Sequence, residues 1–138
     1  MTQINAYLNF DGNCRDAMTF YKDCLGGELM LQTVEGSPVE VQCPAAIKHQ
    51  ILHGSLTNKA LILMGSDMVG PGGLKKGNNI SLSVSCSSEV EANNYFSNLA
   101  DGGKVIEDLK LQFWGAMFGA VIDKFGIIWM FTYRKTKK

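Results

Sequence analysis

The chain lacks an excess of charge of either sign. Its 138 residues carry 13 lysines and arginines against 13 aspartates and glutamates, so its formal net charge is zero at pH 7. A nucleic-acid-binding protein needs surplus cations to displace counterions from phosphates. This balance therefore argues against a nucleic acid as the partner.

The sequence also lacks three other features. The cysteines Cys14, Cys24, Cys43 and Cys86 show no C-x-x-C spacing, which argues against a zinc site built from thiolates. The N-terminal residues have no basic start followed by an apolar run, as a signal peptide would. No stretch approaches the roughly 20 apolar residues that span a membrane. We expect a cytoplasmic protein with reduced thiols and no membrane partner.

A strand-helix unit occurs twice. The first copy begins at Tyr7 and ends at Gly26-Gly27, and the second begins at Ser81 and ends at Gly102-Gly103. Each copy has an alternating strand, a polar hinge, an amphipathic helix and a Gly-Gly pair that ends the helix. Residues 1–138 are therefore predicted to form a single domain of two modules, one over about residues 1–66 and the other over about 79–134.

Periodicity after each Gly-Gly pair predicts three further strands per module. The predicted order is β-α-β-β-β twice, an α+β fold in which a helix covers one face of each sheet. In the first strands, the other face carries Asn5, Tyr7 and Asn9 in one copy and serines 81, 83 and 85 in the other. Because a packing surface would be less polar, a solvated or ligand-filled hollow fits this face better.

Local signals predict three further details. Asn13 is a candidate helix cap, and Ser88 to Glu91 matches a capping box. The connection 36–48 contains two prolines and a possible edge strand over 39–41. Asp67 has two alternative roles, one functional and one in capping turn amides. Trp129 is expected to pack against a helix.

Several motifs, taken together and in order, resemble the vicinal-oxygen-chelate superfamily. That superfamily includes glyoxalase, bleomycin-resistance proteins and extradiol dioxygenases, and this chain looks like its PhnB-like branch. The motifs are Tyr7-Leu-Asn-Phe-Asp-Gly-Asn, Phe20-Tyr21, Leu25-Gly26-Gly27, His53-Gly-Ser-Leu, Leu63-Met-Gly-Ser-Asp67, Trp114-Gly-Ala-Met-Phe-Gly119 and Asp123-Lys-Phe-Gly-Ile-Ile-Trp129.

The resemblance implies two curved mixed sheets around a central cavity, as in the glyoxalase/bleomycin-resistance fold, commonly completed in a homodimer. Active members of the superfamily hold a divalent metal through one residue from each of four strands. In this chain those places fall on Asn5, Leu63 or Met64, Asn79 and Met130. Amides and apolar side chains are poor ligands for Ni, Zn, Fe or Mn, which prefer imidazole and carboxylate. We therefore expect no cofactor, unless an unusual ion site forms around His53.

The candidate ligand-binding residues are Asn5, Tyr7, His53, Asn79, Ser81 and Trp114. His53 is also the candidate catalytic residue, as a general base or a donor to a ligand, against the alternative of a half-buried histidine bonded to a backbone carbonyl.

Three functions stay open at this point. The first is capture of a small organic molecule in a cavity without metal. The second is a metal-dependent lyase, isomerase or dioxygenase whose ion site includes His53. The third is a structural dimer that binds no ligand. Whether the chain is an enzyme is uncertain from the sequence. The Gly70-Pro-Gly-Gly73 segment matches neither G-x-G-x-x-G nor the Walker pattern, so it does not indicate a methyltransferase or a phosphate-binding loop.

Overall fold

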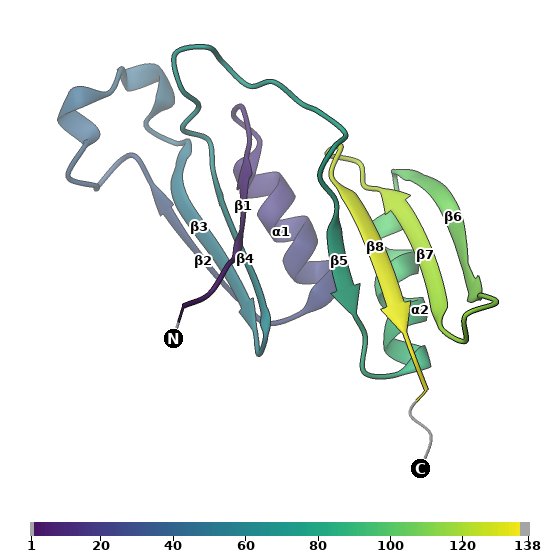
Figure 1. Ribbon diagram of the computed structural model, residues 1–138. Helices are drawn as coiled ribbons and strands as arrows, with labels where there is room; N and C mark the ends of the chain where they lie inside the picture. Colours follow the sequence, from purple (N-terminus) through teal and green to yellow (C-terminus); the bar gives the residue numbers. More distant parts are fainter. Residues whose placement is uncertain (1, 136–138) are drawn as a thin grey trace. The chain divides into compact units, whose positions relative to one another are not determined.

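A computed structural model describes residues 2–135. The chain divides into two compact units, with the boundary between Lys75 and Lys76. The first unit has one helix and four strands (Figure 1): β1 (Ala6–Asn9), α1 (Cys14–Leu25), β2 (Glu28–Thr33), β3 (Ile51–Asn58) and β4 (Leu61–Ser66). The second unit repeats this order: β5 (Leu82–Ser85), α2 (Glu89–Ala100), β6 (Lys104–Leu111), β7 (Met117–Ile122) and β8 (Ile128–Tyr133). The predicted α+β fold of two βαβββ modules is confirmed.

The two sheets share one topology. The strand order is β1-β4-β3-β2 in the first sheet and β5-β8-β7-β6 in the second. In each sheet the first strand pairs in parallel with the fourth, and the remaining pairs are antiparallel. The parallel pair brings the end of the last strand beside the start of the helix, which matters for the site below.

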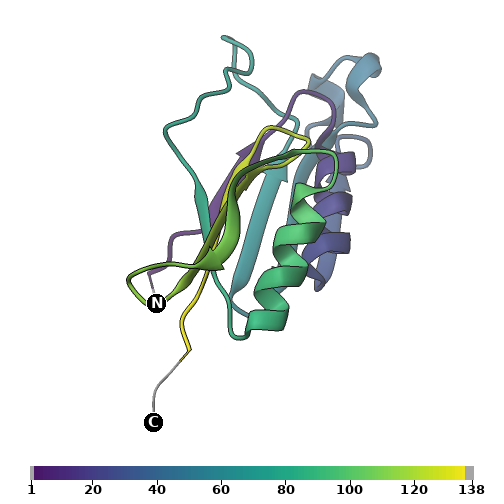
Figure 2. The same cartoon turned by 90° about the vertical axis from the view of Figure 1, so that its right-hand side faces the viewer.

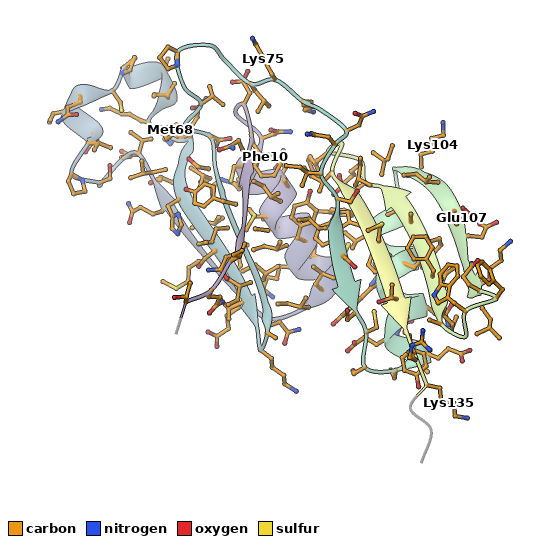
Figure 3. All side chains as sticks on the ribbon, viewed as in Figure 1. Phe10, Met68, Lys75, Lys104, Glu107 and Lys135 are labelled. Carbon is orange, nitrogen blue, oxygen red and sulfur yellow. The ribbon has the colours of Figure 1, made fainter. Side chains whose placement is uncertain are left out.

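The helix α1 covers one face of the first sheet. Its apolar stripe, which includes Ala17, Met18 and Tyr21, is fully buried. Gly65 of β4 lies on this covered face, because a Cβ added there would come within 3.2 Å of the Met18 sulfur. Phe10, which lies where β1 leads into α1, is buried as well (Figure 3).

The second helix, α2, lies along one face of the second sheet (Figure 2). Phe96 of this helix meets Phe131 of β8 edge to face at 6.1 Å, and Phe131 stacks on Trp129. Trp129 is 1% exposed. The expected packing of Trp129 on the helix-covered face is confirmed. At the sheet's edge, Lys104 and Glu107 extend from β6 into solvent (Figure 3).

Helix α1 ends at Leu25, as the glycine pair predicts, with Gly26 in a positive-φ conformation. Gly27 must be glycine for a second reason, since a Cβ there would clash with the carbonyl oxygen of Thr57.

One local prediction was wrong, and another was confirmed only in part. The segment 39–41 is not a strand: the connection instead contains two short 3₁₀ helices, Glu40–Gln42 and Ala45–Ile47. Backbone bonds from Glu40 to Ser37 and from Gln42 to Val39 close tight turns there, so no partner strand is needed. Asn13 occupies the cap position of α1, but its side chain makes no capping hydrogen bond.

The capping box of α2 is confirmed and gives a testable contrast with α1. The Ser88 hydroxyl accepts a hydrogen bond from the Glu91 amide at 3.0 Å, and the Glu91 carboxylate accepts from the Ser87 amide at 2.9 Å. We expect Ser88→Ala to lower the free energy of unfolding by about 1 kcal/mol. Asn13→Ala is the control and should change it by less than about 0.5 kcal/mol. Urea denaturation measures both; an equal loss in the two variants would contradict the assignment.

Candidate functional site

The strongest candidate site is a tyrosine–histidine pair on the face of the first sheet that α1 does not cover, which we call the open face. The Tyr7 hydroxyl and the His53 Nδ1 atom are hydrogen-bonded at 3.2 Å, with ring centroids 5.7 Å apart. Tyr7 is 46% exposed, and His53 is exposed. His53 is therefore neither half-buried nor bonded to a backbone carbonyl through this nitrogen.

Strand register places an apolar row beside this pair. Tyr7 pairs with Met64, Met64 with Ser55, and Ser55 with Met30, so these four side chains follow one another across the open face. Met30 is 71% exposed and Met64 is half-buried. Methionine side chains adapt their shape and contact aromatic rings favourably through sulfur. This surface can therefore hold the body of a ligand beside two polar groups.

Polar side chains border the same row. Gln32 pairs with His53, two residues before Ser55 in β3, and Asn9 pairs with Ser66, two residues after Met64 in β4. Ser66 is buried, and its hydroxyl donates to the Leu52 carbonyl at 2.8 Å. Ser66 thus supports the sheet, whereas Asn9 and Gln32 are exposed at the margin of the face.

Asn5 lies outside the strand that the sequence predicted for it. The strand β1 begins at Ala6, and Asn5 is exposed just before it, accepting a hydrogen bond from Gln3 Nε2 at 2.6 Å. The alternation is right, but the pairing of β1 with β4 begins at Ala6 and Leu63, so Asn5 lies before the paired residues. A role for Asn5 in binding stays a prediction.

The three other candidates belong to the second unit. Asn79 and Ser81 are exposed and precede β5, so Ser81 also lies outside its predicted strand. Trp114 lies in the β6–β7 connection, 46% exposed, and meets Phe113 and Phe118 edge to face at 5.1 and 6.3 Å. Residues 111–114, at the end of β6 and in the β6–β7 connection, form an exposed surface that we call the aromatic hairpin. A binding role for Trp114 there stays a prediction.

Asp67 is a structural residue rather than an exposed functional one. It is 4% exposed, directly after β4. One carboxylate oxygen accepts from the Gly12 and Cys14 amides at 2.9 Å, and the other accepts from the Ile51 amide at 2.8 Å. The carboxylate therefore caps α1 from a distant part of the chain, taking the place that the sequence assigned to Asn13.

The thiols of the buried Cys14 and the half-buried Cys86 are poor nucleophiles. Burial, with a smaller contribution from the Asp67 charge, raises the pKa of Cys14 to about 12. Burial and the Glu91 carboxylate raise the pKa of Cys86 to about 11. Because the thiolate is the reactive form, both side chains are protonated and unreactive at neutral pH.

The superfamily's metal positions carry a donor set that does not fit a hard or borderline divalent ion. Leu63 is buried on the α1 side of the sheet, so Met64 is the one of the two alternatives that faces the open side. Asn5, Met64, Asn79 and Met130 supply amides and thioethers, not imidazoles or carboxylates. Among residues 2–135, no three His, Cys, Asp or Glu side chains gather as a metal site would require.

The glycine-rich segment does not meet a helix. Residues 70–79 contain no regular element, and the next one along the chain is the strand β5. A nucleotide-binding loop would present its amides together with the N-terminus of a helix. No helix in the described part of the chain is long and apolar enough to cross a membrane.

Comparison with known proteins gives a consistent family. Residues 2–132 match the family model described as 3-demethylubiquinone-9 3-methyltransferase. The chain is 32% identical to Protein YjdN of Escherichia coli (strain K12) in an alignment 136 positions long, and the match covers 92% of this chain and 92% of that protein.

Solved structures agree with this match. Protein PA1353 from Pseudomonas aeruginosa superposes with a TM-score of 0.85 at 37% identity, over 99% of this chain and 100% of that one. A PhnB protein from Bacillus cereus has a TM-score of 0.73 at 23% identity, over 96% and 99%. A glyoxalase/bleomycin resistance protein/dioxygenase family enzyme from Burkholderia phytofirmans PsJN shares the fold, with a TM-score of 0.60 at 11% identity, over 94% and 98%. The resemblance read from the motifs is confirmed.

Proposed function

The chain belongs to the 3-demethylubiquinone-9 3-methyltransferase family, in the PhnB-like branch of the glyoxalase-type fold, and on this premise we propose that it binds a small organic molecule on the open face of its first sheet. The observation that carries the proposal is the hydrogen-bonded pair of Tyr7 and His53, exposed beside the methionine row. We propose that binding needs no metal, because the residues at the superfamily's ligand positions are amides and thioethers.

Three properties of the open face support a ligand rather than bare solvent. Tyrosine presents a large apolar ring with a polar tip, a combination enriched where proteins bind partners. Met30 is 71% exposed, which leaves its side chain without burial in the isolated unit. The polar groups sit on strands, which hold them more firmly than loops would.

The family description names a methyl transfer, and we do not extend that activity to this chain. The segment 70–79 leads into a strand and offers no helix N-terminus. Because their pKa values are raised, the Cys14 and Cys86 thiols are protonated at neutral pH, and neither is favoured as a nucleophile. Capture of the ligand without covalent chemistry is the function that these residues support best.

A thermal-shift screen of the full chain against a fragment library tests the proposal. We expect hits whose affinity falls about tenfold or more in His53→Ala, since a hydrogen bond to a buried ligand is worth about 1.5 kcal/mol. Tyr7→Phe should weaken the same hits, because the Tyr7 hydroxyl orients the imidazole.

His49→Ala is the matched control. His49 is 89% exposed at its side chain and lies 3.6 Å from Glu35 in the connection before β3. The His49→Ala variant should bind every hit with the same affinity as the parent protein. A library without any hit, or hits that ignore His53→Ala, would overturn the proposal.

We also propose that the chain works as a homodimer. The aromatic hairpin exposes Leu111 (71%), Phe113 (97%) and Trp114 (46%), an apolar surface of the kind that a second copy covers. Analytical ultracentrifugation should give twice the mass of the chain, and Phe113→Asp should shift the protein toward the monomer. A parent protein that stays monomeric at about 100 μM would contradict this proposal, since the dissociation constant of a stable dimer lies well below that concentration.

We propose a cytoplasmic location as well. The four cysteines are free, and the thiols of Cys14 and Cys86 are held protonated. These features suit a reducing compartment.

A further inference from the structure

We propose that the ligand of the open face is an organic anion: an apolar body that carries a carboxylate or another acidic oxygen. This inference rests on the proposed function, because it assigns a chemical class to the molecule bound beside Tyr7 and His53. It follows from the hydrogen-bonding capacity of the pair and from the distance between His53 and the acidic side chain on the same face.

The pair presents a donor to solvent in two of its three proton arrangements; in the third, the neutral imidazole carries its proton on Nδ1, and Nε2 is a bare acceptor that an anion selects against. When the Tyr7 hydroxyl donates to His53 Nδ1, the neutral imidazole carries its proton on Nε2. When the imidazole is protonated, Nδ1–H donates to the Tyr7 oxygen and Nε2 again carries a proton. Within residues 2–135 the structure records no hydrogen bond to His53 Nε2. A ligand acceptor, and best an anionic oxygen, completes this group.

The neighbouring side chains add donors without adding competing acids. Ser55 lies two residues from His53 along β3, and Asn9 lies two residues from Tyr7 along β1, so both are on the same face as the pair, and each can donate to an oxygen. The acid that shares this face is Glu28, at the start of β2 and paired with Thr57. Thr57 is four residues along β3 from His53, which is about 13 Å in a strand. No acidic side chain of the first sheet's strands is thus placed to neutralise His53.

The apolar row defines the other half of the ligand. Met30 and Met64 flank Ser55 on the same face. Ile62, which is half-buried, lies two residues before Met64 in β4 and faces the same side. Thioethers and an aliphatic side chain bind aryl or alkyl groups but satisfy no hydrogen bond. A free inorganic anion would leave this row uncovered, so the ligand needs an apolar body attached to its acidic group.

Matched acid and amide pairs test the inference by isothermal titration calorimetry on the full chain. The probes are benzoate with benzamide and octanoate with octanamide, so the apolar body stays constant while the charge is removed. We expect at least one acid to bind about tenfold more tightly than its amide, and His53→Gln to remove most of that preference. Glu28→Gln is the control, and it should leave the preference in place.

The outcomes separate this inference from the proposed function. Amides that bind as well as their acids, or an acid preference that survives in His53→Gln, would overturn the anion assignment while leaving small-molecule binding intact. Fragment hits that are all neutral or cationic, with no binding of either acid, would overturn it as well. An absence of binding by any probe or fragment would overturn the proposed function and this inference together.

Discussion

Replacing Asp67 with alanine is expected to lower the free energy of unfolding by about 4 kcal/mol. The substitution leaves the buried amides of Cys14 and Ile51 without their acceptor, and it also removes the partly buried hydrogen bond of the Gly12 amide. Each buried donor without a partner costs about 1–3 kcal/mol, and hydrogen bonds to a charged group lie at the upper end. Because the free energy of unfolding of a small domain is only about 5–15 kcal/mol, a loss of this size brings the variant close to unfolding.

Two companion variants keep the Asp67 prediction measurable. Asp67→Asn retains the shape and one acceptor oxygen, so it should fold and lose about 2 kcal/mol. Asp11→Asn changes an exposed aspartate in the same hinge and should stay within about 0.5 kcal/mol of the parent protein. Urea denaturation followed by circular dichroism measures all three. Similar stability in the two asparagine variants would contradict the role assigned to Asp67.

Trp129→Ala is expected to cost about 4 kcal/mol in the second unit. The side chain is 1% exposed, stacks on Phe131 at an angle of 9°, and donates from Nε1 to Asp123 Oδ2 at 2.8 Å. Removing a buried indole leaves a large cavity, for which about 3–5 kcal/mol is usual.

The other tryptophan supplies the control for this prediction. Trp114 is 46% exposed in the β6–β7 connection, and Trp114→Ala should lower the free energy of unfolding by less than about 1 kcal/mol. Denaturation of each variant should be followed by circular dichroism, because each substitution also removes one of the two fluorophores. A Trp114→Ala variant as unstable as Trp129→Ala would contradict the prediction that Trp129 contributes far more than Trp114 to the stability of the second unit.

The elements that the sequence predicted well are those set by local signals. Glycine pairs mark the ends of both helices, and Ser88 with Glu91 forms the expected capping box. Alternation in β1 and β5 separates exposed from covered side chains, even though each strand begins later than predicted. These patterns depend on neighbours within a few residues, which a single sequence displays.

The features that the sequence could not settle depend on distant contacts. Asn13 satisfies the local rule for a cap, but the parallel pairing of β1 with β4 brings Asp67 to the same amides. A carboxylate offers more to the helix N-terminus than a neutral amide does, so it takes the position. The pairing of Tyr7 with His53, 46 residues apart, was likewise beyond local pattern. Both residues were candidates, and only the register of β1, β4 and β3 shows that they meet.

The cavity around which the two modules were expected to curve stays a prediction, as do the roles of Asn5, Asn79, Ser81 and Trp114 in binding. What supports the binding proposal is narrower than that cavity. It is one hydrogen-bonded pair and one row of thioethers on a sheet face that α1 leaves uncovered.

The NMR signals of the imidazole rings offer the most direct test. The chain contains two histidines, of which His53 lies in the candidate site and His49 lies outside it, in the connection before β3. In a two-dimensional proton–carbon spectrum of the histidine rings, titration with a fragment hit or a bound organic acid should move the His53 signal while the His49 signal stays in place. A ligand that binds the protein yet leaves the His53 ring unchanged would contradict the account.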